Sequence, residues 1–260
     1  MAEVLVLDTP ADAGAFVAAH IAAAVRANPE FTLGVATGST PLPVYEALRA
    51  EAAAGTDFTR MSAFALDEYV GLPAGHPESY RAVVDREVTE PLGLDPARVR
   101  VPDGSRDGVR TAGERYEADL REHGGVDLQL LGIGRTGHLG FNEPGSSFGS
   151  LTRVKTLTER TRLDNARFFD SLDQVPVHCV TQGLGTILRA RHLVLLAFGE
   201  SKAEALAAAV EGPVSASMPG SAIQLHPRVT VVVDPAAASR LRFADYYRWA
   251  QDHKPEWQGI

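Results

Sequence analysis

The sequence contains a single cysteine, Cys179, and no apolar run as long as the roughly 18 residues that a membrane-spanning helix needs. One cysteine excludes an intramolecular disulfide, and its apolar surroundings indicate a buried thiol in a reducing compartment. The first residues, 1–8, also lack the basic segment and long apolar stretch of a signal peptide. We therefore expect a cytoplasmic protein that does not act at a membrane.

The net charge and the spacing of the histidines bear on which ligands the protein can bind. The formal net charge of −8 argues against binding to nucleic acid, because phosphate backbones are held by clustered lysine and arginine. A small anionic substrate needs only two or three local donors and stays possible. None of the histidines shows the His-x-x-x-His spacing of a common metal motif, so we predict no metal site.

The order of apolar and helical patterns predicts the fold class. The chain has 260 residues, 45% of them hydrophobic, which suffices for one large domain, and it contains no internal repeat or low-complexity linker. Apolar runs of strand length alternate with helical patterns. The runs are 4–7, 31–36, 61–66, 126–131, 192–198 and 229–233, and the helical patterns are 11–26, 41–52, 79–88, 110–123, 203–210 and 235–247. This alternation predicts a single α/β domain over 1–260, with a Rossmann-like, doubly wound, mostly parallel sheet flanked by helices.

The glycine-rich loop after the run 126–131 is the first candidate site. A buried strand that opens into such a loop places it at the carboxyl end of the sheet, where ligands bind in α/β folds. His138 and Glu143 are the side chains of this loop that titrate below neutral pH, and Asn142 lies beside them. A histidine in a turn can be a merely hydrogen-bonded loop residue. Three polar groups within six residues instead favour a site for acid–base chemistry.

A second candidate site is the turn Thr37-Gly38-Ser39-Thr40, which joins the strand 31–36 to a helix. We expect Thr40 to cap this helix and Pro41 to be its first residue. Backbone N–H groups at a helix start attract anions, and the hydroxyls add donors, so the turn suits a phosphate. The alternative is an ordinary capped turn. The spacing and the Lys-Ser/Thr ending of a Walker loop are missing.

Charged residues follow two other predicted strands. Asp67 and Glu68 come directly after the strand 61–66 and face the same crevice, although either could simply cap the next segment. Lys202 lies at the start of a helix, where a cation opposes the helix dipole. An anionic ligand shared with that helix end would explain its position.

Taken together, these segments resemble the glucosamine-6-phosphate deaminase family along nearly the whole chain. The Asn-Glu-Pro element is the specific one, because the related 6-phosphogluconolactonases are not expected to carry it. The matching segments are 37–41, 66–69, Gly137-His138, Phe141-Asn142-Glu143-Pro144, Arg167-Phe168-Phe169 and Gln224-Leu225-His226-Pro227. The resemblance implies isomerisation and deamination of glucosamine 6-phosphate to fructose 6-phosphate and ammonia in amino-sugar catabolism, without a cofactor.

The resemblance also implies residue roles. Asp67 would be the base that moves the C2 proton to C1, and His138, hydrogen-bonded by Glu143, would carry the ring-oxygen proton. Thr136 stands where better-known members have an aspartate, so His138 would rely on Glu143, and this difference bears on the pH optimum. The phosphate would be bound by Thr37, Gly38, Ser39, Thr40, Arg167 and Lys202.

Some members of that family are hexamers activated by N-acetylglucosamine 6-phosphate at a subunit interface. The residues that resemble this activator site are Ser146, Arg153, Lys155 and Thr156. The alternative is that these polar residues only face solvent. The segment after Asp234 matches the activated members less well, which argues against such regulation.

Two other functions fit parts of the pattern. A 6-phosphogluconolactonase-like hydrolase would use the same phosphate turn but needs no C2 base, so Asp67 and the Asn-Glu-Pro element count against it. A non-catalytic phosphosugar-sensing module should carry an added helix-turn-helix, for which 260 residues leave no room.

Overall fold

A parallel sheet of seven strands forms the centre of the molecule. The computed structural model describes residues 2–255 and 258–260. Neighbouring strands pair in parallel along the whole sheet. Their order is β1 (Glu3–Val6), β10 (Val229–Val233), β9 (Leu193–Ala197), β6 (Leu128–Gly132), β2 (Thr32–Val35), β3 (Ser62–Ala65) and β5 (Val99–Arg100). The predicted fold class is confirmed.

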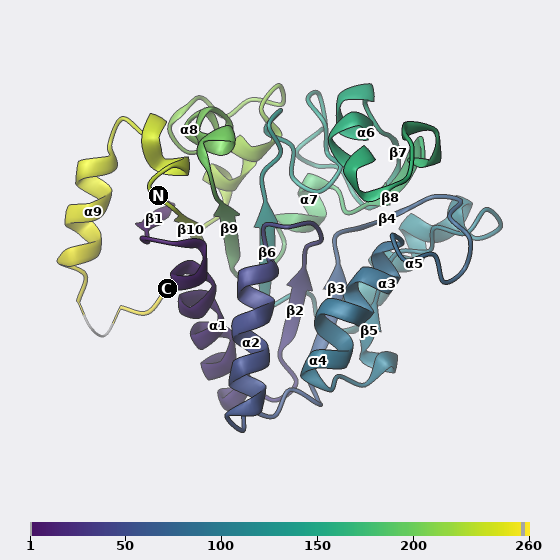
Figure 1. The fold of residues 1–260 in the computed structure, drawn as a ribbon, viewed down its shortest axis with the longest axis horizontal. Coiled ribbons are helices and arrows are strands. Elements are labelled where there is room, and N and C mark those ends of the chain that lie inside the picture. Colours follow the sequence, from purple (N-terminus) through teal and green to yellow (C-terminus); the bar gives the residue numbers. More distant parts are fainter. Residues whose placement is uncertain (1, 256–257) are drawn as a thin grey trace.

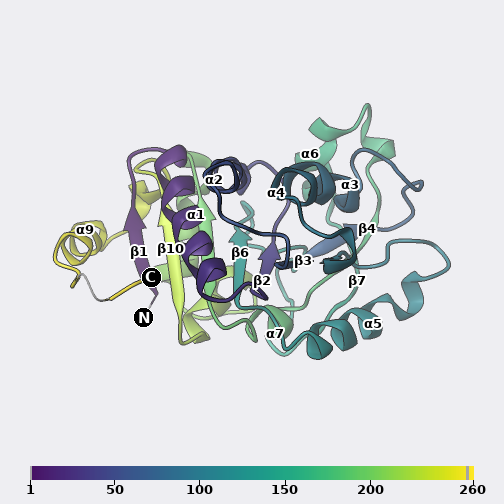
Figure 2. The ribbon, with the colours of Figure 1, turned by 90° about the horizontal axis from the view of Figure 1, so that it is seen from below.

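Helices cover both faces of this sheet (Figures 1 and 2). One face packs against α1 (Pro10–Ala27), α2 (Leu42–Ala53) and a continuous helical segment formed by α3 (Tyr80–Val84), a π-helical turn (Asp85–Thr89) and α4 (Glu90–Leu92). The other face packs against α5 (Val109–Glu122), α7 (Leu184–Ile187) and α8 (Ala203–Glu211). Side chains along β6 alternate between the two cores, because successive residues of a strand point to opposite faces.

The helix pair α1 and α2 shows how local sequence positions this layer. Thr9 caps α1, since its hydroxyl accepts a hydrogen bond from the Asp12 N–H at 3.1 Å, and Pro10 follows in the first turn. The two helices approach so closely that a Cβ at Gly14 would lie 2.3 Å from the Pro43 carbonyl oxygen. Glycine at this position therefore sets the distance between α1 and the helix that follows the Thr37 turn.

A second, antiparallel sheet was not predicted. It contains β4 (Asp67–Tyr69), β8 (His178–Thr181) and β7 (Arg153–Thr156) in that order. The chain leaves the parallel sheet at Leu66 and enters the small sheet at Asp67. The residues predicted to follow the strand 61–66 therefore form a strand of their own, β4. Cys179 lies in β8 with no exposed surface, as predicted for a buried thiol, and this burial raises the pKa of its thiol.

Three predicted helices differ in detail. Helix α2 begins at Leu42 with Pro41 as its N-cap, and no side chain caps it, so Thr40 stays available for other contacts. The helix predicted over 79–88 continues through α4 and includes Pro91. The helix predicted over 235–247 is instead a 3-10 turn (Ala237–Arg240) and α9 (Ala244–Asp252). The break occurs because Glu211 accepts hydrogen bonds from the N–H groups of residues 242 and 243.

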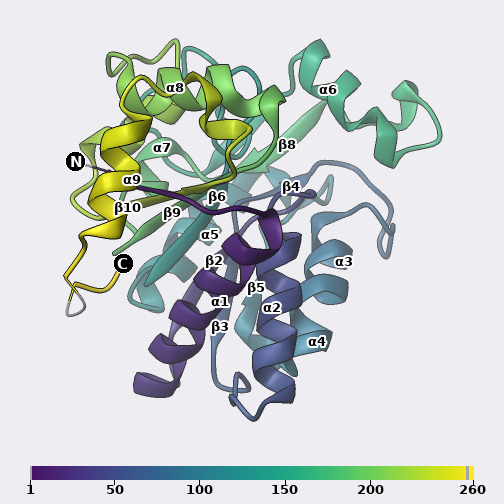
Figure 3. The ribbon, with the colours of Figure 1, turned by 60° about the vertical axis from the view of Figure 1, so that its left-hand side comes forward.

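A further helix and several 3-10 turns complete the structure. This helix, α6 (Glu159–Asn165), and α8 lie at the same end of the molecule in two views (Figures 1 and 3). The short 3-10 turns are Pro96–Arg98, Ala166–Phe168, Leu172–Gln174, Glu200–Lys202 and Pro219–Leu225. Across the described ranges, no helix is both long and apolar enough to span a membrane.

Candidate active site

A cavity of about 960 Å³ opens at the carboxyl ends of β2, β3, β6 and β9. The chain runs from β2 toward β3 on one side and from β6 toward β9 on the other, so the cavity lies where the strand order reverses. Ligands bind at such switch points in open α/β sheets. The predicted residues that line it are Thr37, Gly38, Ser39, Thr40, Asp67, His138, Arg167 and Lys202. The structure therefore brings together residues from separate segments that the sequence analysis singled out.

The Thr37 turn has the geometry of an anion site. Gly38 adopts φ +89°, a conformation that other residues rarely take, and this turns the backbone over the N-terminus of α2. Within the described part of the chain, no backbone hydrogen bond occupies the N–H groups of residues 38–40. Tyr45 fixes the base of the turn, because its hydroxyl donates to the Ala36 carbonyl at 2.7 Å and accepts from the Ala36 N–H at 3.1 Å. The N–H groups of the turn are thus held on a rigid support at the cavity wall.

Three cations converge on the same region. Lys202 extends from the start of α8 and donates to the Ile133 carbonyl at 2.8 Å, which explains its position at a helix N-terminus. Its pKa is lowered by burial and by the nearby charges of Arg135 and Arg167. All three side chains line the cavity. Arg135 was not predicted from the sequence, although it lies in the glycine-rich loop three residues before His138.

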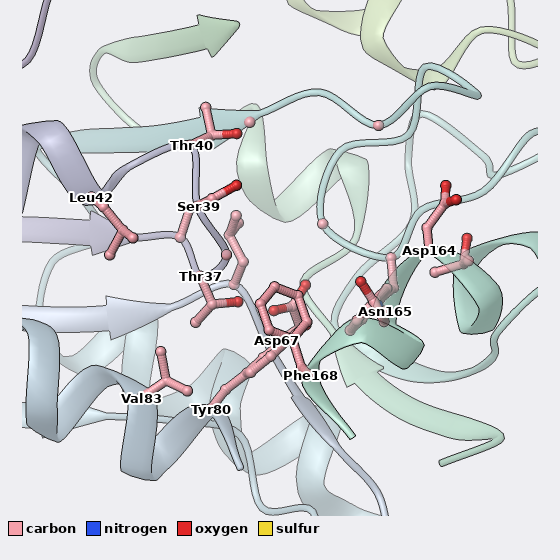
Figure 4. Close-up of a pocket in the computed structure, with 18 of the residues that line it drawn as sticks. Thr37, Ser39, Thr40, Leu42, Asp67, Tyr80, Val83, Asp164, Asn165 and Phe168 are labelled. Carbon is pink, nitrogen blue, oxygen red and sulfur yellow. The ribbon is translucent and has the colours of Figure 1, made fainter. Parts of the chain in front are cut away.

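Asp67 lies on the cavity wall with only 5% of its surface exposed. Burial, followed by the nearby charge of Glu68, raises the pKa of Asp67 to about 8. Gly140 adopts φ +55°, and a Cβ there would lie 3.2 Å from the Asp67 carboxyl, so the loop that carries His138 packs directly against this acid. Figure 4 shows Asp67 deep in the cavity beside Tyr80 and near Thr37. A carboxyl group in this environment suits proton transfer near neutral pH.

Glu68, unlike Asp67, caps the helical segment that follows, which was the alternative role expected for these two acids. Its carboxylate accepts hydrogen bonds from the N–H groups of Tyr69 at 2.7 Å and of Tyr80 and Arg81 at 2.9 Å. It therefore anchors the start of α3 and does not line the cavity. The capping interpretation is correct for Glu68, whereas the neighbouring Asp67 faces the cavity.

His138 is held by a chain of polar groups behind it. The Thr136 hydroxyl lies 3.0 Å from His138 Nδ1 and donates to Glu143 at 3.2 Å, while Nδ1 and the Glu143 carboxylate are 3.5 Å apart. The resemblance implied a hydrogen bond between the histidine and Glu143, and the Thr136 hydroxyl joins the two in a triangle. Gly134 allows this arrangement, since a Cβ there would lie 2.2 Å from His138 Nε2. The imidazole is thereby oriented from its Nδ1 side.

Glu143 is an ionised carboxylate at the centre of this group. It also accepts hydrogen bonds from the hydroxyls of Thr158, at 3.2 Å, and Thr161. Burial alone would raise its pKa, but the hydrogen bonds with His138 and the threonines outweigh this and hold the pKa of Glu143 at about 2. Asp67 and Glu143 are therefore two buried carboxyl groups whose environments move their pKa values in opposite directions. That contrast is typical of acid–base sites.

The four residues assigned to an activator site lie outside the cavity lining. Ser146 is buried, and its hydroxyl donates to the Glu143 carbonyl at 2.7 Å. Arg153, Lys155 and Thr156 lie on β7, where Arg153 donates to the Leu151 carbonyl at 3.3 Å. The Arg153 and Lys155 side chains are half-buried and share one face of the strand, whereas Thr156 is exposed on the other.

Comparison with known proteins decides the family. Residues 8–232 match the model of a family described as glucosamine-6-phosphate isomerases/6-phosphogluconolactonase. The chain belongs to this family. Among its relatives is the glucosamine-6-phosphate deaminase of Streptomyces coelicolor, which is 60% identical over 260 residues that cover 99% of this chain and all of the relative. The glucosamine-6-phosphate deaminase of Bifidobacterium longum is 54% identical over 272 residues and covers both chains completely.

Solved structures of family members show the same architecture. A monomeric glucosamine-6-phosphate deaminase superimposes with a TM-score of 0.88 and 40% sequence identity, covering 92% of this chain and 99% of the other. The 6-phosphogluconolactonase from Trypanosoma cruzi superimposes with a TM-score of 0.76 at 21% identity, covering 93% and 97% of the chains. This second likeness shows a shared fold alone. The resemblance inferred from the sequence motifs is confirmed.

Proposed function

We propose that this protein converts glucosamine 6-phosphate and water to fructose 6-phosphate and ammonia. The observation that carries the proposal is the placement of a buried carboxyl, Asp67, and an oriented imidazole, His138, in one cavity with a phosphate-binding turn. Relatives at 54 to 60% identity that bear the deaminase name support the same reaction. We place this reaction in the cytoplasm, in keeping with one unpaired cysteine.

The site assigns the proton transfers to these two residues. His138 transfers a proton to the ring oxygen as the pyranose opens, and Glu143 with Thr136 stabilises the charge on its imidazole. Asp67 then removes the proton from C2 and returns it to C1, while O1 gains a proton and the nitrogen loses one, so the C1 carbonyl becomes an alcohol and the C2 amine becomes an imine. Water adds to this C2=N bond and ammonia leaves, so the products are a ketose phosphate and ammonia. Within the described residues no group of acids, histidines or cysteine has the arrangement of a metal site.

The phosphate group supplies binding energy at the opposite end of the substrate. The N–H groups and hydroxyls of residues 37–40 surround it from one side. Arg167 offers a two-pronged guanidinium and Lys202 a point charge from the other. Because these contacts lie far from C1 and C2, they bind substrate and transition state about equally.

An assay of the purified protein tests the proposal directly. We expect ammonia release from glucosamine 6-phosphate and no hydrolysis of 6-phosphogluconolactone. Lactone hydrolysis requires no base at C2, so it would leave Asp67 without a role. Lactone hydrolysis without ammonia release would overturn the proposal. Binding of both phosphosugars with no turnover of either would instead support a sensing module.

Lys202→Ala tests the phosphate assignment. We expect KM for glucosamine 6-phosphate to rise by about 10²-fold with kcat within a few fold of the parent, because the lost contact contributes uniform binding. Lys254→Ala is the matched control, since Lys254 pairs with Glu3 and lies outside the cavity lining. Initial-rate kinetics on both variants would measure this. A loss confined to kcat would place Lys202 in the chemistry instead.

If N-acetylglucosamine 6-phosphate activated this protein, it would bind at the site predicted from Ser146, Arg153, Lys155 and Thr156. An activator bound there would have to draw the Ser146 hydroxyl away from the Glu143 carbonyl. The 40% identical deaminase structure is of a monomeric protein. We therefore expect a 27.8 kDa monomer with hyperbolic kinetics that the activator leaves unchanged. Sedimentation and rate measurements check this, and a sigmoidal curve made hyperbolic by the compound would establish the activator site.

A further inference from the structure

An ion pair crosses the wall of the cavity at its cationic end. Arg135, in the loop after β6, donates to the carboxylate of Asp164 in α6, and both side chains line the cavity. In Figure 4, Asp164 lies across the cavity from Thr37 and Ser39. The pair thus joins the loop that carries His138 to the segment that carries Arg167.

The ion pair between Arg135 and Asp164 is weak enough for Arg135 to leave Asp164 and bind another anion. The Arg135 side chain is 46% exposed and that of Asp164 is 35% exposed. Exposed pairs of this kind contribute little to stability, because water screens the charges and the long side chains lose freedom. Asp164 also has a second cation, since Arg160 lies 3.4 Å from the same carboxylate. Asp164 would therefore keep a partner if Arg135 moved away.

The surroundings of Arg135 favour a dianion over the single carboxylate. The positive charges of Arg135 and Arg167 lower the pKa of Lys202, so the three cations are close enough to repel one another. Asp164 is the one carboxylate that pairs with Arg135 within the described residues. A phosphate dianion brings two charges and accepts both prongs of a guanidinium, which makes such contacts stronger than an exposed carboxylate pair.

We propose that Arg135 is a third phosphate-binding cation and that Asp164 competes with the substrate for it. When the phosphosugar binds, the Arg135 guanidinium leaves Asp164 and turns to the phosphate, while Asp164 stays paired with Arg160. Arg135 and Asp164 then affect phosphate affinity in opposite directions. This inference rests on the proposed function for the identity of the substrate, but its anion chemistry is independent of turnover.

Two substitutions with opposite effects test the proposal. Arg135→Gln should raise KM for glucosamine 6-phosphate by about tenfold, and Asp164→Asn should lower it by about threefold, with kcat within about twofold in both. In the double variant the Asp164→Asn gain should disappear, because there is no guanidinium left to release. If the ion pair only held two segments together, both single variants would weaken binding alike.

Inorganic phosphate is the probe that separates this inference from the proposed function. Its dissociation constant, measured by calorimetry, should change in the same directions in Arg135→Gln and Asp164→Asn as KM does. Lys254→Ala is the control, because Lys254 pairs with Glu3 and lies outside the cavity lining, and it should change phosphate affinity by less than about twofold. Phosphate affinity that is unchanged in Arg135→Gln would overturn the inference. The predicted changes in a protein that releases no ammonia would leave it standing and reject only the deaminase function.

Discussion

Asp67→Asn should abolish exchange of the C2 proton with solvent, lower kcat by at least about 10³-fold and leave phosphosugar binding almost unchanged. The substitution keeps the shape of the side chain but removes the group that accepts the proton. Exchange is measured by NMR in D2O as the loss of the C2 proton signal of glucosamine 6-phosphate. Exchange at the parental rate would reject Asp67 as the base.

The same substitution should also stabilise the protein. Asp67 has its pKa raised from an ordinary 3.8 to about 8 in the folded state, so folding opposes its ionisation. Below about pH 4 the group is protonated in both states and the substitution has little effect. As the pH rises from about 4 to 8, the unfolded parent ionises and the parent loses stability, whereas the amide of the variant has no proton to lose. The gap should reach a few kcal/mol near pH 8.

Chemical denaturation at several pH values measures this gap, and Glu68→Gln provides the contrast. Glu68 anchors the start of α3 through three backbone hydrogen bonds and lies outside the cavity lining, so its replacement should leave C2 exchange in place. Loss of exchange in Asp67→Asn alone would separate the base from the helix anchor. Equal stability of Asp67→Asn and the parent at pH 8 would contradict the raised pKa.

The ends of the main strands were more predictable from the sequence than the segments that leave them. The runs that form β2, β6 and β9 are apolar and bounded by glycine, and parallel strands bring their carboxyl ends to one edge. That geometry explains why Thr37, His138 and Lys202 meet in one cavity. The prediction that they share one edge depends on the strands being parallel, which the alternation of strands and helices already indicates.

Contacts between distant segments were beyond the reach of the sequence. Asp67 and Glu68 are adjacent acids, and only the pairing of β4 with β8 turns one toward the cavity and the other toward α3. Arg135 lines the cavity and pairs there with Asp164, which lies 29 residues later in the chain. The break before α9 likewise depends on Glu211 in another helix. Local patterns do not specify such partners.

Glu143→Gln should reduce kcat by about 10²-fold with little change in KM. Glu143 faces His138 Nδ1 at 3.5 Å, both directly and through the Thr136 hydroxyl, and its negative charge stabilises the imidazolium formed during proton transfer. Glutamine keeps the size of the side chain but cannot supply that charge. Thr136→Val removes the bridging hydroxyl and leaves the carboxylate, so its loss in kcat should be nearer tenfold. A larger loss in Thr136→Val than in Glu143→Gln would show that the hydroxyl, not the carboxylate, supports the histidine.

The pH dependence of stability gives an independent measure of the same charge. Folding lowers the pKa of Glu143 from an ordinary 4.5 to about 2, so its ionised form stabilises the folded state. That contribution, on the order of 3 kcal/mol, is complete above about pH 5 and is lost as the pH falls toward about 2. Glu143→Gln should therefore be less stable than the parent at pH 7, and the two should converge near pH 2. Asp67→Asn shows the opposite sign, because burial dominates at Asp67 and hydrogen bonds dominate at Glu143.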